Sequence, residues 1–304
     1  MSSNTRAVSF TPSSIILNGE MMDAREVKIN PFSPSFQYGL NVFEGVRGYI
    51  DKEGHCRPFL LNEHLDRLES SARLMRLGNG LDTDRLKDDV ETLLAQEPPS
   101  DDIYLKIMVF TNADASWSYT GNIDTFVFYY ELKSSIRVEF PSEVKGKFCS
   151  FRRIDANVMP PRVKAGPNYI NSRLGFLEVN PPESKSESCF PLFFNSSGRV
   201  SESSGACLFF AKDGGLVTPG LSSSILPSIT RRHLLDHFDG GGKELKVLES
   251  DVDRWDLYDA DEVFVCGTNV EVAAMVEIDG YRIGDGRPGP CTLQAFDYLK
   301  TCAL

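Results

Sequence analysis

The alternation of helix-like and strand-like segments constrains the fold of this chain more than any other feature of its sequence. In the first half, apolar residues recur at intervals of three and four and predict a helix over residues 62–77 with Asn62 as its N-cap; they are Leu61, Leu65, Leu68, Ala72 and Met75. A second helix is expected over residues 82–95. Strands over residues 103–110 and 125–130 are expected to flank a polar loop at 112–122.

The segments before these helices are expected to be extended. A strand from Ser14 enters a turn at Asn18-Gly19, a dipeptide typical of hairpins, and a further extended stretch leads into residues 38–49. Residues 1–14 lack the apolar core of a signal peptide. We therefore expect a loose tail on a cytoplasmic protein.

The second half repeats the alternation. A charged segment with little periodicity at 133–147 is expected to be a linker, which sets two domains at residues 1–135 and 136–304. Beyond it the patterns predict helices and strands; the helices are 169–179 and 228–238, and the strands are 189–194, 207–212 and 262–266. Strands and helices that alternate in both halves predict an α/β or α+β fold, with the order of strand pairing left open.

The charge balance and the cysteines exclude several classes of protein. With 32 basic and 43 acidic residues the net charge is −11, which argues against a protein that binds nucleic acid or an anionic membrane. No apolar run reaches the roughly 18 residues that a membrane-spanning helix needs. The seven cysteines include no CxxC pair, which indicates reduced thiols in a cytoplasmic protein and offers no zinc framework.

Familiar metal-binding and nucleophile patterns are not convincing in this sequence. His233 and His237 lie four residues apart on one predicted helix, a spacing that can hold a metal, but no third ligand stands nearby. A solvated helix face explains them better, so we expect no metal. Nothing resembles a G-x-S-x-G motif or a paired cysteine and histidine, so neither a serine nor a cysteine nucleophile is expected.

Lys164 stands out because of the segments that follow it. A single lysine in a loop is normally a solvated surface charge. Here the segment 198–205 follows, with a turn and then the acid Glu202. Residues 228–230 then open a predicted helix, whose unpaired N–H groups can bind an anion without a glycine-rich loop. Thr268 ends a later strand among small residues.

Six short motifs occur in one order along the chain. They are Phe43–Arg47 (FEGVR), Glu63–Leu68 (EHLDRL), Lys164–Tyr169 (KAGPNY), Ser201–Gly205 (SESSG), Leu226–Arg231 (LPSITR) and Cys266–Thr268 (CGT). Together they resemble the class IV, or fold type IV, pyridoxal-phosphate enzymes, and the branched-chain amino-acid aminotransferases in particular. The resemblance runs from Asn18 to Asp285. It implies an α/β (α+β) enzyme of two domains that binds pyridoxal 5'-phosphate in the cleft between them.

The resemblance assigns the chemistry of the cofactor to three residues. Lys164 matches the Schiff-base lysine, whose amine also moves the proton between the substrate Cα and the cofactor. Glu202 matches the acid that bonds the pyridine nitrogen and keeps the ring protonated, so that the ring can accept electrons. Tyr169 matches the tyrosine that hydrogen-bonds the phenolic oxygen of the cofactor; from the sequence alone, a core aromatic is nearly as good an interpretation of Tyr169.

A second group of residues is implied to bind the cofactor phosphate. Arg67 matches the arginine that clamps the phosphate, although it lies about 200° from Leu65 on a helical wheel, where composition alone indicates a surface residue. The resemblance also implies that the backbone amides of Ile229 and Thr230 bind the phosphate. The hydroxyl groups of Thr230 and Thr268 complete this set.

Most of the residues implied to bind the substrate belong to the first domain. Tyr38, Phe43 and Arg47 belong to the branched-chain, L-selective version of the motifs, in which the tyrosine and phenylalanine line a pocket for an aliphatic side chain. For Phe43 a core aromatic on a strand is an equal alternative. Tyr104 shares a strand face with Lys106, because the two residues are two positions apart.

Two positions depart from the branched-chain pattern. Lys106 stands where these enzymes usually carry an arginine that helps to hold the distal carboxylate of glutamate or 2-oxoglutarate, and lysine offers a point charge in place of a planar fork. Asn269 replaces a small residue in the turn whose amides receive the α-carboxylate. Both departures put the amino-acid specificity in question, and they leave the cofactor assignment intact.

The resemblance implies an aminotransferase that moves an amino group between a branched-chain or other hydrophobic L-amino acid and a 2-oxo acid such as 2-oxoglutarate. The cycle is ping-pong, through Lys164, and the family implies a homodimer whose other partners are these small molecules. A specialised-metabolism enzyme with an unusual donor remains open. The alternatives on the same scaffold are a 4-amino-4-deoxychorismate lyase and a D-amino-acid or (R)-amine transaminase, against which the FEGVR motif argues. A non-catalytic relative is disfavoured because Lys164 and Glu202 are both kept.

Overall fold

The computed structural model describes residues 12–78, 80–183, 188–240 and 246–304. The chain divides into two compact units, Met1–Ser134 and Ser135–Leu304, where the sequence predicts a boundary after residue 135. Most of the expected N-terminal tail, residues 1–11, lies outside the described residues. None of the helices in the described ranges combines the length and the apolar character that crossing a bilayer requires.

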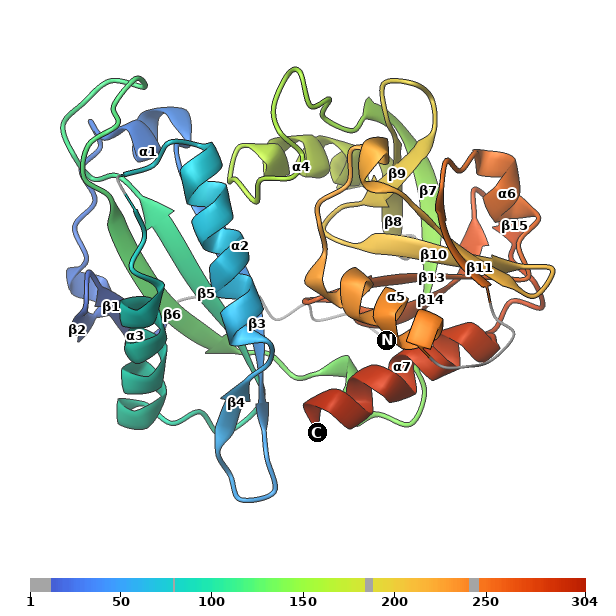
Figure 1. The fold of residues 1–304 in the computed structure, drawn as a ribbon, viewed down its shortest axis with the longest axis horizontal. Helices are drawn as coiled ribbons and strands as arrows, with labels where there is room; N and C mark the ends of the chain where they lie inside the picture. The colour runs from blue at the N-terminus through green and yellow to red at the C-terminus, as the bar shows by residue number, and fades with distance from the viewer. Residues whose placement is uncertain (1–11, 79, 184–187, 241–245) are drawn as a thin grey trace. The chain divides into compact units, whose positions relative to one another are not determined.

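The first unit is an antiparallel sheet with helices against one face (Figure 1). Its described strands pair in the order β2-β1-β6-β5-β3-β4; their bounds are β1 Ser14–Leu17, β2 Glu20–Asp23, β3 Val42–Ile50, β4 Cys56–Pro58, β5 Ile103–Phe110 and β6 Asp124–Glu131. The helices are α1 Pro34–Tyr38, α2 Leu61–Leu74 and α3 Thr83–Gln96. Helix α2 packs on β3, and α3 packs on β1 and β6. The apolar stripe predicted for α2 is buried here, at Leu65, Leu68 and Ala72.

The second unit is built on a mixed sheet. Its described strands pair in the order β12-β11-β10-β13-β14-β7-β8-β9, with β15 added to β14; their bounds are β7 Ser142–Arg152, β8 Cys189–Phe194, β9 Val200–Ser203, β10 Cys207–Lys212, β11 Gly215–Pro219, β12 Lys246–Ser250, β13 Glu262–Gly267, β14 Glu271–Ile278 and β15 Tyr281–Arg282. The helices are α4 Asn168–Val179, α5 Ile229–Gly240, α6 Arg254–Tyr258 and α7 Pro290–Ala303. Helix α4 packs on β7 and β8, while α5 and α7 both pack on β13.

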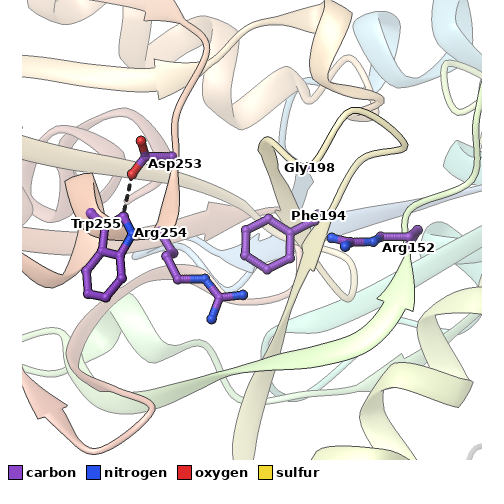
Figure 2. Close-up of a pocket in the computed structure, with 6 residues that line it drawn as sticks. All are labelled: Arg152, Phe194, Gly198, Asp253, Arg254 and Trp255. Atoms are coloured by element: carbon purple, nitrogen blue, oxygen red, sulfur yellow. Dashed lines mark hydrogen bonds between the residues drawn. The ribbon is translucent and has the colours of Figure 1, made fainter.

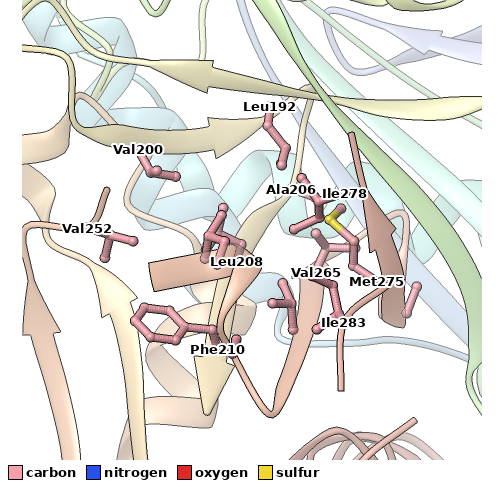
Figure 3. Close-up of a cluster of buried hydrophobic side chains, with 14 of the residues drawn as sticks. Leu192, Val200, Ala206, Leu208, Phe210, Val252, Val265, Met275, Ile278 and Ile283 are labelled. Atoms are coloured by element: carbon pink, nitrogen blue, oxygen red, sulfur yellow. The ribbon is translucent and has the colours of Figure 1, made fainter. Parts of the chain in front are cut away.

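The core of the second unit lies where four of these strands meet α6. Leu192, Leu208, Val265 and Met275 come from β8, β10, β13 and β14, and they are buried in one apolar cluster (Figure 3). Residues just before and within α6 close the cluster. Burial of each such side chain contributes about 1.5–3 kcal/mol to folding. This cluster holds in place the strands whose ends carry the candidate site.

Two local predictions for the first unit are wrong. Residues leading to Tyr38 are expected to be extended, but Pro34–Tyr38 is a short helix, because Ser33 accepts the N–H of Phe36 and Gly39 ends the turn at a φ of 69°. Asn62 is expected to cap α2, but it lies inside the helix. The N-cap is Leu60, which follows β4 and has a left-handed backbone conformation. Its side chain forms no capping hydrogen bond.

The expected linker at residues 133–147 is also partly wrong. Strand β7 begins at Ser142 and pairs in parallel with β14 and β8. Its charged residues alternate with Val144 and Gly146, so only one side of its first half faces the core. That alternation is short and includes few apolar residues, so apolar periodicity alone does not predict this strand.

Candidate active site

Lys164 lies in the loop between β7 and α4, beside Tyr169 in the first turn of α4. The Nζ atom of Lys164 donates to the Oη atom of Tyr169 at 2.7 Å, and both side chains are half-buried, which leaves them accessible. Asn168 anchors the loop, because its side-chain amide donates to the carbonyl oxygens of Pro160 at 3.1 Å and Val163 at 2.9 Å. The amine therefore lies on a loop that is tied to the first turn of α4 rather than on a loose surface segment.

Glu202 is buried at the end of β9, and both of its oxygens are bound. Its Oε1 accepts from Arg153, from Nε at 2.8 Å and from Nη2 at 2.7 Å, and its Oε2 accepts from the backbone N–H of Leu226 at 3.2 Å. Burial raises the pKa of Glu202, and the charges of Arg153 and Lys164 with the Leu226 bond oppose that rise without cancelling it. Arg153 also donates to the side chain of Asn171 at 3.3 Å, and Ser204 donates to the carbonyl oxygen of Ser172 at 3.0 Å, so the Glu202 segment lies beside the helix that carries Tyr169.

The Leu226 bond brings the N-terminus of α5 to the same site. Helix α5 begins at Ile229, and Ser228 caps it by accepting the N–H of Arg231 at 3.2 Å. Ile229 and Thr230 are buried in its first turn. The N–H groups of such a turn have no partner within the helix and favour an anion.

The turn that carries Thr268 and Asn269 lies beside the segment after Glu202. Cys207 and Cys266 are cross-strand partners in β10 and β13, so the ends of these strands meet. The carbonyl oxygen of Gly205 would lie only 3.1 Å from a Cβ atom at Gly267, so the two turns are in close contact. The half-buried Thr268 and the exposed Asn269 thus stand next to the Glu202 segment.

In the first unit, Arg67 is held by Glu44, which His64 contacts in turn. The buried Glu44 accepts from Nε of Arg67 at 2.7 Å and from Nη2 at 2.8 Å, and Nδ1 of His64 lies 2.7 Å from the same carboxylate. Burial raises the pKa of Glu44, but the charge and hydrogen bonds of Arg67 and His64 outweigh it and lower that pKa to about 2. This carboxylate sets the direction of the arginine.

Replacing Glu44 with glutamine is expected to lower the stability of the protein and to change its acid unfolding. The folded pKa of about 2 is below the ordinary 4.5, so the stabilisation is complete above pH 4.5 and is lost as the pH falls toward 2. E44Q should cost about 3 kcal/mol near neutral pH and less in acid. Denaturant unfolding from pH 7 to pH 3 measures this difference.

The control for this variant is E53Q, because Glu53 is exposed and lies 3.8 Å from Arg57 in a surface pair. E53Q should behave like the wild type at every pH. An E44Q protein that keeps the wild-type stability at neutral pH would contradict the role given to Glu44.

The opposite face of the first sheet carries four of the six expected substrate residues. The pairing of β3 with β5 sets Phe43, Arg47, Tyr104 and Lys106 on one face, whereas Glu44 points to the face that α2 covers. Nζ of Lys106 lies 4.7 Å from the centre of the Phe43 ring, a cation–π contact. This face therefore combines aromatic rings with two cations, Arg47 and Lys106.

Gly45 explains why the FEGVR motif needs a glycine. A Cβ atom at Gly45 would come within 1.9 Å of the Oη atom of Tyr104, so the ring lies across the strand where a side chain would stand. The Tyr104 ring also packs on Tyr130, with ring centres 5.5 Å apart. The glycine thus positions one of the predicted substrate residues.

Two of the expected substrate residues of the first unit differ in their exposure to solvent, since Arg47 is buried and Tyr38 is exposed. Arg47 is buried, and its Nη1 donates to the carbonyl oxygen of Leu132 at 2.6 Å, which gives it a structural contact. Tyr38 ends α1 and is 52% exposed.

Within the described residues, the candidate metal-binding group is Asp51, Glu53 and His55, in the turn between β3 and β4. Asp51 already accepts the backbone N–H groups of Glu53 and His55 and a bond from Nε of Arg57 at 2.6 Å. His237, expected on a solvated face, stacks on Tyr298 with ring centres 4.1 Å apart. Asp51 and His237 are therefore each held by other residues of the protein.

The decisive comparison is with a family model. The model described as "Amino-transferase class IV" matches residues 41–278, which contain all six motifs. The chain belongs to the class IV aminotransferases. The expected mixed α/β, fold type IV enzyme is therefore confirmed, and so is its activity as an aminotransferase.

Individual relatives of this class IV aminotransferase agree with that placement. It is 31% identical over 297 residues to a probable branched-chain-amino-acid aminotransferase of Aquifex aeolicus (strain VF5), covering 95% of this chain and 92% of the relative. The branched-chain amino acid aminotransferase of Thermobaculum terrenum, solved in its PLP-form, matches with a TM-score of 0.86 and 31% identity over 96% of this chain and 94% of that one.

A second solved neighbour carries ligands. The T.th. branched-chain amino acid aminotransferase, complexed with N-(5'-phosphopyridoxyl)-L-glutamate, matches with a TM-score of 0.87 and 28% identity over 97% of this chain and 95% of that one. The same enzyme has been solved with 4-methylvaleric acid.

Some residues of this aminotransferase site escape sequence reasoning. Arg153 directly follows β7 and resembles a surface charge in the sequence, yet it is buried against Glu202. Glu44 and His64 lie in recognised motifs but are assigned no role there. The sequence offers one signal for Glu44, which is an acid inside an apolar strand. A buried acid requires a cation, so this position indicates a charged partner.

Proposed function

We propose that this chain is a pyridoxal-phosphate-dependent aminotransferase that transfers the amino group of branched-chain L-amino acids to 2-oxoglutarate. The observation that carries the proposal is the joint placement of Lys164, Tyr169 and the buried Glu202 in one unit, beside the N-terminus of α5. The branched-chain enzymes among its relatives support the donor class. The neighbour solved with a phosphopyridoxyl-glutamate and with 4-methylvaleric acid supports both sides of the exchange.

The residues of the second unit fit the groups of pyridoxal phosphate. A lysine amine suits its aldehyde, and a phenol 2.7 Å from that amine suits its phenolic oxygen. Glu202 is buried, and its pKa stays raised although Arg153 and Leu226 bind it, so a cationic ring nitrogen suits it as a further partner. The amides of Ile229 and Thr230, with the hydroxyl groups of Thr230 and Thr268, suit the phosphate. Arg67 of the first unit is proposed for the same phosphate.

Each of these residues has a defined task in the reaction. Bound pyridoxal phosphate supplies an aldehyde carbon for the amino group and a ring that withdraws electrons from the substrate Cα. The Nζ atom of Lys164 takes the proton from that Cα and delivers it to the carbon that was the aldehyde carbon of the cofactor. Tyr169 orients Nζ through its hydrogen bond. Arg153 positions Glu202, which keeps a positive charge on the ring nitrogen.

The first unit is proposed to supply the specificity. The face of Phe43, Tyr104 and Tyr130 suits an aliphatic side chain, and the ammonium group of Lys106 suits a second carboxylate. An enzyme of this design accepts both leucine and glutamate. The test is to incubate the purified protein with L-leucine and 2-oxoglutarate and to measure glutamate and 4-methyl-2-oxopentanoate by chromatography. Equal amounts of both products support the proposal, and reaction only with D-amino acids or release of pyruvate from aminodeoxychorismate would contradict it.

Replacing Lys106 with arginine tests the proposed carboxylate contact. A planar guanidinium group can bind a carboxylate through two parallel hydrogen bonds, which an ammonium group cannot. K106R should therefore raise kcat/KM for 2-oxoglutarate relative to a monocarboxylic 2-oxo acid by about tenfold. K28R, a change at an exposed lysine of the same unit, serves as the control. An unchanged ratio in K106R would reject this role for Lys106.

We further propose that the enzyme works as a homodimer in the cytoplasm. All seven cysteines are free thiols, as in a reducing compartment. Phe32 and Phe36 are 63% and 68% exposed around α1, next to Tyr38, and exposed aromatic residues of this kind are typical of interfaces. One chain has a mass of 33.9 kDa, and sedimentation equilibrium of the purified protein should give twice that mass. A monomer at micromolar concentration would contradict the dimer.

A further inference from the structure

Two adjoining clefts on the second unit share Arg254 and Trp255. The first has a volume of about 290 Å³, and Arg152, Phe194, Gly198 and Asp253 also line it (Figure 2). The second, of about 530 Å³, continues past Tyr258 and Tyr281. None of the residues proposed for the cofactor or the substrate lines either cleft. They therefore form a feature that the aminotransferase reaction does not explain.

The two arginines of these clefts are held by aromatic rings. The Cζ atom of Arg254 lies 4.8 Å from the centre of the Phe194 ring, and that of Arg152 lies 5.1 Å from it. Figure 2 shows the two guanidinium groups on either side of this ring. Phe148 stacks on Phe194 with ring centres 4.3 Å apart and supports the arrangement. Within the described ranges, neither guanidinium group forms a hydrogen bond or an ion pair.

The acids that line the clefts are already bound to other groups. Asp253 accepts the N–H groups at the start of α6 and lies 3.9 Å from Arg199. Glu178 accepts both the N–H and the hydroxyl group of Ser150 at 2.8 Å. Asp279 accepts from the backbone of Phe148 and from the hydroxyl group of Tyr258 at 2.6 Å. Within the described residues none of these three acids forms an ion pair with Arg152 or Arg254, so both guanidinium groups remain open to an anion.

Flat aromatic faces are exposed beside these charges. Trp255 is 65% exposed and Tyr281 is 53% exposed. Tyr281 stacks on Tyr258 with ring centres 4.5 Å apart, which holds its ring in place. An exposed indole next to a guanidinium group offers stacking to a planar ring and hydrogen bonds to an anion.

We propose that these clefts bind a small anion that carries a flat aromatic ring. Arg152 and Arg254 bind the anionic group, and Trp255 and Tyr281 stack with the ring. Nucleoside phosphates and aromatic carboxylates share this chemistry. The nucleoside diphosphate fits better, because its charge extends over two phosphates and the two guanidinium groups lie on opposite sides of Phe194.

Titration of the holoenzyme tests the proposal. In a W117F background Trp255 is the remaining tryptophan, so its fluorescence reports on the clefts. We expect ADP to change this fluorescence in a saturable manner and calorimetry to give the same Kd. Adenosine and inorganic phosphate should each bind at least about tenfold more weakly than ADP, because each lacks one half of the ligand. If benzoate binds more tightly than ADP, the ligand is an aromatic carboxylate. The proposal of an anion with a flat aromatic ring then still holds.

Substitutions then decide whether binding occurs at the clefts. R152Q and R254Q should each weaken the binding of ADP by at least about tenfold, since each removes one charged fork. R287Q, a change at an exposed arginine of the same unit outside both clefts, should leave it unchanged. Because both arginines are exposed, the melting temperatures of all three variants should match the wild type. The proposal is overturned if neither ADP nor benzoate binds in a saturable manner, if phosphate binds as tightly as ADP, or if R152Q and R254Q bind like R287Q.

Discussion

Replacing Lys164 with alanine is expected to remove the covalently bound cofactor and to lower turnover by at least about 10⁴-fold. The amine has two tasks in the proposed reaction, as the attachment point of the cofactor and as the base at the substrate Cα, and the base alone contributes about 10²–10⁴-fold. The side chain is half-buried and hydrogen-bonds Tyr169 in the adjoining first turn of α4, so its loss should leave the fold intact. Absorption spectra and single-turnover assays of K164A measure the two tasks separately.

The matched control is K147A, which removes an exposed lysine from β7 of the same unit. It should keep both the cofactor absorption and the turnover of the wild type. A K164A protein with normal turnover would contradict the assignment of the catalytic lysine and, with it, the proposed function.

Replacing Glu202 with glutamine is expected to give the second largest effect. The amide can no longer balance a positive charge on the ring nitrogen, so kcat should fall by about 10²–10³-fold while the cofactor stays bound. The buried Arg153 also loses its anionic partner, which should cost about 1–3 kcal/mol of stability. Thermal unfolding and kcat, measured on the same sample, separate these two consequences.

Glu262 provides a control for the loss of any buried carboxylate. It is buried in the same unit and accepts the N–H groups of Cys291 at 2.9 Å and Thr292 at 2.8 Å, where α7 begins. E262Q should lose stability and keep the kcat of the folded protein. If E202Q retains the wild-type kcat, or if E262Q loses as much activity, the special role of Glu202 is wrong.

Elements with a strong local signal could be predicted from the sequence. The helix of residues 61–74 and the strand of residues 103–110 have clear periods of 3.6 and 2. Strand β14 escaped prediction, because it is nearly buried on both faces and its residues show no alternation. The parallel pairing of β7 with β14 joins segments about 130 residues apart, and no local pattern encodes such a contact.

The candidate site shows the same division. The residues that react carry their chemistry in the side chain, so Lys164 and Glu202 can be recognised by type and by motif. The residues that hold other side chains in place are harder to recognise: Arg153, which holds Glu202, resembles a surface charge in the sequence, and Glu44, which holds Arg67, stands out only as an acid within an apolar strand. Their roles depend on burial and on partners 23 to 49 residues away, and only the folded chain brings these together.

The most direct test of the proposed function is the absorption spectrum of the purified protein, recorded before and after the addition of single L- and D-amino acids. We predict a yellow protein whose long-wavelength band bleaches with L-leucine, L-isoleucine, L-valine and L-glutamate and returns with 2-oxoglutarate. D-amino acids should leave the band unchanged. A colourless protein that takes up no pyridoxal phosphate, or a yellow protein that ignores every one of these L-amino acids, would contradict the account.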